Sequence, residues 1–102
     1  MKKIIKGRLF DTEKANLVCE IWEGNRGDFR HLDCALYQTP RSKVFFLAGW
    51  GGAMTIFSHR CSDGSYCGWD GIIPLNEQDA RMYAEKYGSA ETVQRFFKVE
   101  EA

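Results

Sequence analysis

The histidines and cysteines of this chain are the residues that could most readily bind a metal ion. Imidazole nitrogen and thiolate sulfur are the usual zinc ligands. The chain offers two groups of them, His31 with Cys34, and His59 with Cys61 and Cys67. His31 and Cys34 are three residues apart on a predicted strand and so point to opposite faces, and no two cysteines have the spacing of a zinc knuckle. We therefore predict no metal site and no cofactor, with the thiols buried or incidental.

The same residue types offer two arrangements for catalysis. Cys61 lies two residues from His59, where an imidazole could activate a thiolate nucleophile, but no third residue can be named that would orient the imidazole. His31 and Asp33 share a face of the predicted strand and could act as an acid–base pair. A polar cross-strand surface explains that pair as well. We predict that the chain is not an enzyme and assign no catalytic residue.

Gly49-Trp50-Gly51-Gly52 is a glycine-rich stretch that invites comparison with a phosphate-binding loop. It has neither the lysine of a P-loop nor the GxGxxG spacing, and no long helix is predicted after it. The glycines are better explained by a sharp corner of a sheet, or by the close approach of another backbone.

Charge is balanced overall but unevenly distributed. Lys+Arg and Asp+Glu number 14 each, so the chain has no overall basic footprint for nucleic acid. Residues 1–60 carry ten basic and six acidic side chains, whereas residues 61–102 carry four and eight. The first part keeps open an alternative function, nucleic-acid binding through basic side chains interleaved with aromatic ones that stack on bases. The basic candidates are Lys2, Lys3, Lys6, Arg8, Arg26, Arg30 and Arg41, with Trp22, Phe29, Phe45 and Trp50 as aromatic neighbours.

Neither a membrane segment nor a secretory signal is predicted. No apolar run approaches the ~18 residues of a membrane helix, and Lys6 and Arg8 interrupt the apolar stretch at the amino terminus. We therefore expect a cytoplasmic protein with no membrane partner. In that compartment the four cysteines are expected to be reduced thiols.

Strand-forming composition dominates the first part of the chain. Alternating apolar and polar residues predict strands over residues 4–10, 17–23, 29–38 and 43–50, and a shorter one over 54–58. Thr39-Pro40-Arg41-Ser42 carries turn chemistry and makes a hairpin of the third and fourth strands. The second strand should place alternate residues on its two faces, Leu17, Cys19 and Ile21 on one, and Val18, Glu20 and Trp22 on the other.

Helical signals are confined to the carboxy-terminal part, after a predicted loop over residues 59–71. Asn76 is the expected N-cap of a helix that ends at Gly88, and Ser89 is the expected N-cap of a second, short helix. The buried faces are predicted to be Ala80, Tyr83, Ala84 and Tyr87 in the first helix, and Val93, Phe96 and Phe97 in the second. The chain is thus predicted to be a single α+β domain over residues 1–102. Its bent antiparallel sheet has about four to five strands, followed by one or two C-terminal helices packed on one face.

Three blocks of the chain, in this order, are similar to a known family. They are residues 1–15 (MKKIIKGRLFDTEKA), 36–55 (LYQTPRSKVFFLAGWGGAMT) and 72–88 (IIPLNEQDARMYAEKYG), about half of the sequence. They resemble a family of short proteins carried by phages, plasmids and integrative elements. Small proteins of this provenance include anti-CRISPR inhibitors, which bind a surveillance complex or nuclease and usually have no chemistry of their own. The resemblance implies a non-enzymatic inhibitor in the cytoplasm of a bacterial host, with a Cas effector as its partner.

Such an inhibitor needs only a rigid surface that complements its target. One candidate surface is acidic and could occupy a groove meant for nucleic-acid phosphate, with candidate residues Glu77, Asp79, Glu85, Glu91, Glu100 and Glu101. The other is a pair of loops whose aromatic side chains could act as hot spots, namely Trp50, Tyr66 and Trp69. The chain is expected to be a monomer or a homodimer.

Overall fold

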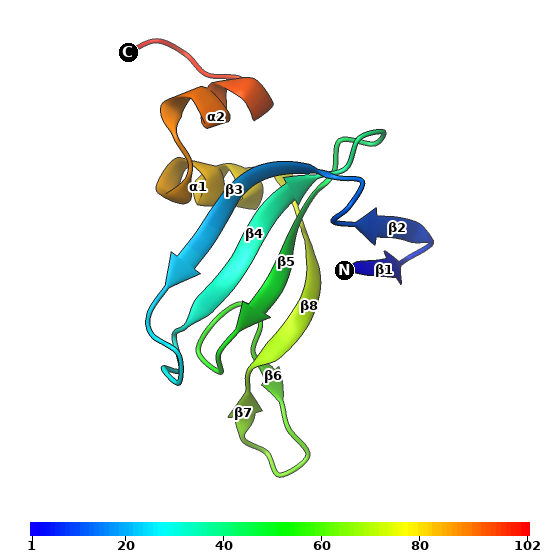
Figure 1. The fold of residues 1–102 in the computed structure, drawn as a ribbon, viewed down its shortest axis with the longest axis vertical. Helices are drawn as coiled ribbons and strands as arrows, with labels where there is room; N and C mark the ends of the chain where they lie inside the picture. The colour runs from blue at the N-terminus through cyan, green and yellow to red at the C-terminus, as the bar shows by residue number, and fades with distance from the viewer.

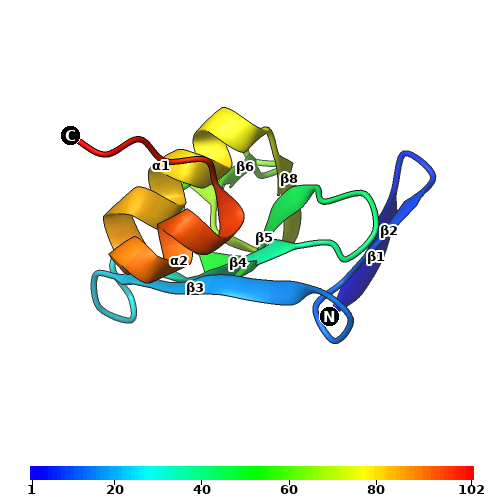
Figure 2. The same cartoon turned by 90° about the horizontal axis from the view of Figure 1, so that it is seen from above.

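A four-stranded antiparallel sheet forms the centre of the computed structural model, which describes residues 1–102 (Figure 1). Its strands, in spatial order, are β3 (Asn16–Glu23), β4 (Leu32–Gln38), β5 (Phe45–Gly51) and β8 (Trp69–Leu75). Two helices follow, α1 (Glu77–Tyr87) and α2 (Ala90–Phe96). Both lie on one side of the sheet (Figure 2), so the predicted α+β fold with C-terminal helices on one face is confirmed.

The two helices begin where local capping signals place them. The side-chain oxygen of Asn76 accepts a hydrogen bond from the backbone N–H of Asp79 at 2.7 Å, and that of Ser89 accepts one from Thr92 at 3.2 Å. Ala80 and Ala84 are fully buried on the face of α1 that packs against the sheet. Gly88 ends α1 with φ −93°, so its position requires no left-handed backbone.

The amino terminus forms a hairpin in place of the single strand predicted over residues 4–10. β1 (Lys2–Ile5) pairs with β2 (Arg8–Asp11) across a two-residue turn. Lys6 and Gly7 both have positive φ, 51° and 80°, which is the backbone of a type I′ hairpin turn. Lys6-Gly7 interrupts the apolar run between Ile5 and Leu9, a turn signal that the strand prediction over residues 4–10 overlooked.

The segment after β5 also differs from the predictions. Residues 54–58 form turns where a strand was predicted, because the Thr55 hydroxyl donates to Gly52 O at 2.8 Å and accepts from Phe57 N at 3.2 Å. The loop predicted over residues 59–71 instead contains a small hairpin, β6 (His59–Arg60) and β7 (Tyr66–Cys67), and the start of β8. β8 was missed because Gly71 and Pro74 are turn-forming residues in most contexts. At the edge of the sheet proline is tolerated, and here it lies opposite Phe46.

A β-bulge in β3 exchanges the predicted faces of Leu17 and Val18. The register with β4 shifts between Leu17 and Cys19, which inserts one residue and changes the alternation. Val18 is therefore buried beside Cys19 and Ile21, and Leu17 is exposed. Beyond the bulge the prediction holds, with Glu20 and Trp22 on the opposite, exposed face.

Hydrophobic cores lie on both faces of the sheet. The larger one, under the helices, is built around Ile21, Leu36, Leu47 and Phe57. The smaller one lies where the β1–β2 hairpin packs on the other face, and its buried residues are Phe10, Phe46, Ala48 and Ile72. The hairpin covers only part of that face, and the remainder stays open to solvent. Neither helix is long and apolar enough to cross a lipid bilayer.

Candidate functional site

The open part of the sheet carries a row of four cross-strand neighbours on the face opposite the helices. Trp22 of β3 lies opposite Asp33 of β4, which lies opposite Trp50 of β5, and Asp70 of β8 completes the row. Trp22 is 60% exposed and Trp50 38%, a large fraction for indole rings in a molecule of this size. Glu20 lies in the adjacent row on the same face. We name these five residues the acidic–aromatic face: Glu20, Trp22, Asp33, Trp50 and Asp70.

Only carboxylates carry charge within the four strands. The strands contain no lysine or arginine, and their charged residues are Glu20, Glu23, Asp33 and Asp70. Glu23 points to the helix side, where Lys86 of α1 pairs with it at 3.2 Å. A hydrogen bond from Tyr87 and the interaction with Lys86 lower the pKa of Glu23. The three carboxylates of the acidic–aromatic face have no ion-pair partner.

A hollow of about 400 Å³ lies within this face. Ala35 and Ala48 are cross-strand neighbours, and their methyl side chains leave the space above them unfilled. Glu20, Trp22 and Asp33 also border the hollow. It therefore offers an apolar floor with two carboxylates and an indole around it, which suits a long side chain that ends in a positive charge.

The imidazole ring of His31 packs against both indole rings. Its side chain is almost fully buried, and its ring centre lies 4.7 Å from that of Trp22 and 5.4 Å from that of Trp50. Its Nδ1–H donates to the carbonyl oxygen of Glu23 at 3.1 Å, because a carbonyl can only accept. His31 precedes β4 and does not lie on a strand as predicted, and no hydrogen bond joins it to Asp33. This histidine holds the tryptophans in place.

Glycine at position 49 permits the close packing of β5 on β4 beneath this face. Gly49 has φ +146°, and a Cβ atom there would collide with the backbone of Asp33 and Cys34. Gly52 packs in the same manner against the backbone of Phe29. The explanation of these glycines by close backbone approach is therefore confirmed.

A shallow groove of about 250 Å³ continues the aromatic surface at the lower end of the molecule as drawn in Figure 1. It brings together Phe29, Trp50 and Tyr66, three exposed aromatic side chains from separate segments. Of the predicted aromatic set, Trp50 and Tyr66 thus share a surface. Trp69 does not join them, because it packs over Gly71 and lies 6.2 Å from the Phe57 ring in the larger core.

The predicted acidic residues of the helices have local structural roles. Glu77 and Asp79 lie in the first turn of α1 and Glu91 in the first turn of α2, where carboxylates stabilise the helix dipole. Glu85 forms an ion pair with Arg81 at 3.0 Å. Glu77 and Glu85 border different hollows. These side chains are exposed, but each has a structural explanation.

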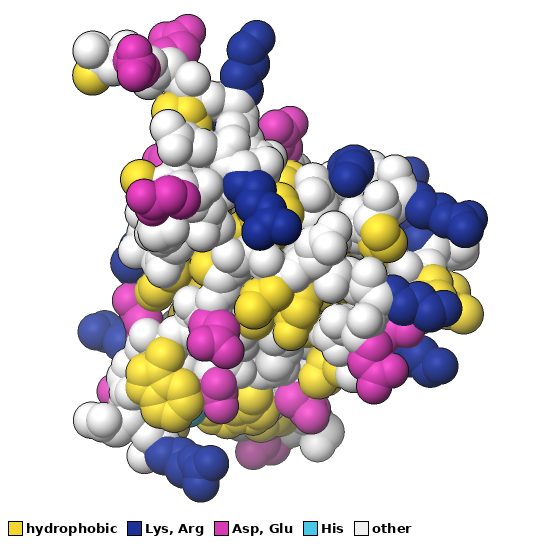
Figure 3. All heavy atoms as spheres, turned by 45° about the horizontal axis from the view of Figure 1, so that its top comes forward, with side chains coloured by type: hydrophobic (Ala, Val, Ile, Leu, Met, Phe, Trp, Pro, Cys, Tyr) yellow, Lys and Arg dark blue, Asp and Glu magenta, His cyan; other side chains and the backbone are white.

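The predicted basic residues fall into two groups. Lys6 and Arg8 belong to the β1–β2 hairpin and Arg41 to the β4–β5 turn, whereas Arg26 and Arg30 lie in the β3–β4 loop at the other end of the sheet. Figure 3 shows Lys and Arg side chains gathered on the right, over the hairpin and the turn. Hydrophobic and acidic side chains alternate over the lower part of the same view.

The cysteines correct one prediction. Cys61 and Cys67 form a disulfide across the β6–β7 hairpin, with their Cα atoms 6.0 Å apart, so these two are not the reduced thiols that were expected. Burial raises the pKa of the Cys34 thiol to about 12, and also raises that of Cys19. Neither free cysteine is therefore a ready nucleophile. No three His, Cys, Asp or Glu side chains converge as metal ligands would.

No family model, curated protein or solved structure matches this chain. Its function is therefore argued from the acidic–aromatic face and from the distribution of charge. Sequence reasoning missed Asp33 and Asp70 as binding residues, because their place beside Trp22 and Trp50 follows from strand register. The one local signal was the alternation in β3, which places Glu20 and Trp22 together on one face.

Proposed function

We propose that the protein is a non-enzymatic binding protein whose acidic–aromatic face docks onto a basic surface of a partner protein. The observation that carries this proposal is the absence of any lysine or arginine from four strands that display three unpaired carboxylates. Opposite charge on two surfaces steers them together and fixes their register. Tryptophans that bury a large area on contact supply most of the affinity at such interfaces.

The partner proposed is a host defence complex, most specifically a Cas effector in the cytoplasm of a bacterial host. An expectation from the sequence and a physical argument support this choice. The chain resembles short proteins of phages and other mobile elements, some of which are anti-CRISPR inhibitors. A groove that binds nucleic acid must also be basic, since it neutralises phosphates with lysine and arginine. A face that carries only carboxylates among aromatic rings is suited to occupy such a groove.

Neutral, nearly isosteric substitutions test the proposal. The variant Glu20→Gln/Asp33→Asn/Asp70→Asn removes three charges from the face, and Glu91→Gln/Glu100→Gln/Glu101→Gln removes three from α2 and the tail. Each is expressed with an affinity tag in a CRISPR-bearing host. Protection of a targeted plasmid is measured, as is retention of Cas proteins from a nuclease-treated lysate.

We expect the native chain and the tail variant to protect the plasmid and to retain a Cas effector. The face variant should lose at least about tenfold in retention, the equivalent of 1.4 kcal/mol. If the tail variant fails while the face variant succeeds, the acidic side chains of α2 and the tail form the binding site. If the native chain protects nothing and retains no Cas protein, the inhibitor proposal is wrong.

A further inference from the structure

Half of the basic side chains of this protein gather at one end of the molecule. Residues 1–15 and 39–44 together contain seven of the 14 Lys and Arg and only two of the 14 Asp and Glu. These segments are the β1–β2 hairpin with the connection that follows it, and the β4–β5 turn. We name the seven residues the basic end: Lys2, Lys3, Lys6, Arg8, Lys14, Arg41 and Lys43.

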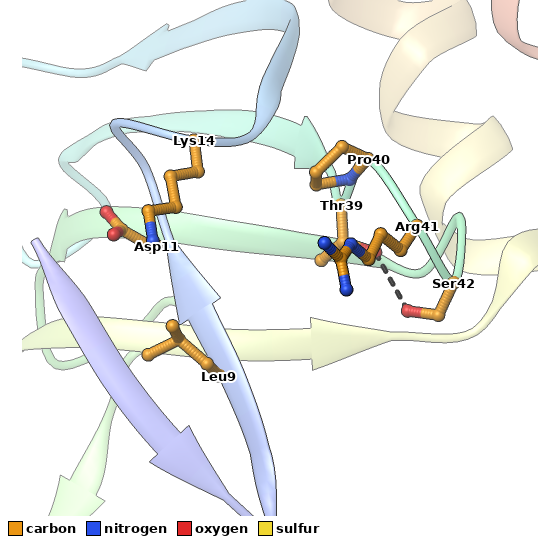
Figure 4. Close-up of a pocket in the computed structure, with 7 residues that line it drawn as sticks. All are labelled: Leu9, Asp11, Lys14, Thr39, Pro40, Arg41 and Ser42. Atoms are coloured by element: carbon orange, nitrogen blue, oxygen red, sulfur yellow. Dashed lines mark hydrogen bonds between the residues drawn. The ribbon is translucent and has the colours of Figure 1, made fainter.

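A cavity of about 440 Å³ opens within the basic end, between β2 and the β4–β5 turn. Figure 4 shows the Arg41 guanidinium directed from the turn toward the space in front of β2, and Lys14 bordering that space from the other side. Neither cation has an ion-pair partner. Leu9 forms part of the wall, and the Ser42 hydroxyl lies beside Arg41.

Asp11 is the one carboxylate that borders this cavity, and hydrogen bonds hold it in place. Its carboxylate points away from Arg41 in Figure 4, and its Oδ1 accepts the backbone N–H of Glu13 at 3.0 Å. Its carbonyl oxygen accepts from the N–H groups of Lys14 and Ala15. Asp11 therefore fixes the connection that carries Lys14.

The turn that carries Arg41 is equally well fixed. The Thr39 N–H donates to the Val44 carbonyl oxygen at 2.8 Å, and the Thr39 Oγ1 accepts the Val44 N–H at 3.0 Å. The same Oγ1 lies 3.1 Å from the Ser42 Oγ. Pro40 presets the backbone before Arg41. Both cations at the cavity are thus mounted on ordered segments, so less entropy is lost when an anion binds between them.

We propose that this cavity binds a phosphate group and that the basic end binds the sugar–phosphate backbone of nucleic acid. Lys14, Arg41 and the Ser42 hydroxyl all line the cavity, and charged and hydroxyl donors of this kind suit the oxygens of a phosphate group. The other five cations lie outside the cavity lining, and one of them, Lys3, lies over the Trp69 ring with its Nζ 5.2 Å from the ring centre. A single phosphate would leave these cations unused, whereas a repeating phosphodiester would engage them. The exposed side chains of Ile4 and Leu9 lie opposite each other in the hairpin and offer apolar contact to sugars.

This site is separate from the acidic–aromatic face, and the inference does not depend on the proposed function. It is tested by fluorescence anisotropy with a labelled single-stranded oligonucleotide and a labelled duplex, between about 50 and 200 mM salt. The variant Lys14→Gln/Arg41→Gln removes the two cations of the cavity. Arg95→Gln/Lys98→Gln, which changes two exposed cations in α2 and the tail, is the matched control.

The native chain should bind with an affinity that falls steeply as salt rises. The cavity variant should lose about tenfold or more in affinity, and its slope of log K against log salt should be smaller in magnitude by about 1–2. The control should match the native chain, and Glu20→Gln/Asp33→Asn/Asp70→Asn should bind at least as tightly as native. The absence of binding at low salt, or equal binding by the cavity variant, would overturn the proposal. Binding to phosphatidylserine vesicles without binding to either oligonucleotide would assign the basic end to a lipid surface and would also overturn it.

Discussion

Asp33 and Cys34 are neighbours in β4 that face opposite sides of the sheet. The carboxylate of Asp33 is exposed beside two tryptophans, while the thiol of Cys34 is buried in the larger core. Burial, with smaller contributions from the charges of Asp33 and Cys19, raises the pKa of Cys34 to about 12. One step along a strand thus separates a charge available to a partner from a group kept neutral by its surroundings.

The pKa of Cys34 predicts a loss of stability at high pH. The unfolded thiol loses its proton above pH 9.0, while the folded thiol keeps it up to about pH 12. The contribution of Cys34 is therefore complete below pH 9 and is lost as the pH rises toward 12. Urea unfolding across this range should show a smaller loss of unfolding free energy for Cys34→Ala than for the native chain. Parallel curves for the two proteins would contradict this prediction.

The β6–β7 hairpin is too short to be stable without the disulfide that closes it. Its strands have two residues each and form a sheet of their own, and a hairpin that short is not stable alone. Cys61 and Cys67 close a loop that links its two strands. Tyr66, which lines the aromatic groove, is carried by this hairpin.

Removal of the disulfide should loosen this hairpin and leave the main sheet intact. The variant Cys61→Ser/Cys67→Ser is expected to lose about 2 kcal/mol at most, because the closed loop is short. Amide hydrogen exchange should become faster over residues 59–68 and stay unchanged in β4 and β5. Reduction of the native chain with dithiothreitol should give the same pattern. Faster exchange throughout the sheet would show that the hairpin supports the whole fold.

Helix caps can be predicted from nearby residues in the sequence, whereas strand partners cannot. Asn76 and Ser89 cap their helices through bonds to residues three positions away, so both helices were predictable. β8 could not be predicted, since Gly71 and Pro74 are strand residues only because β5 lies beside them. The same holds for the row of Trp22, Asp33 and Trp50, which is set by register between strands. Local pattern predicted the two helices and three of the four strands of the central sheet, and tertiary pairing decided the site.

At the scale of the whole molecule, β5 joins the two hydrophobic cores. Phe45 and Leu47 point into the core under the helices, and Phe46 and Ala48 into the core under the N-terminal hairpin. Phe46 is fully buried, with its ring centre 5.3 Å from those of both Phe10 and Tyr37. Because one strand supplies both cores, the two should unfold together.

Truncation of Phe46 should therefore destabilise the entire molecule. Phe46→Ala is expected to cost about 3–5 kcal/mol, a large part of the stability of a domain this small. Phe46→Leu keeps most of the volume and should cost less. Urea unfolding followed by tryptophan fluorescence and by far-UV circular dichroism should give coincident transitions for both variants. Separate transitions would show that the cores are independent.

The basic end and the acidic–aromatic face separate opposite charges within this molecule, whose net charge is zero. A neutral particle gains little from long-range attraction toward a charged partner, but a dipolar one experiences a torque in the partner's field. Near a basic groove the molecule would rotate before contact, with its carboxylates leading and its lysines trailing. Orientation would then be settled during approach, and a larger share of collisions would begin with the correct face forward.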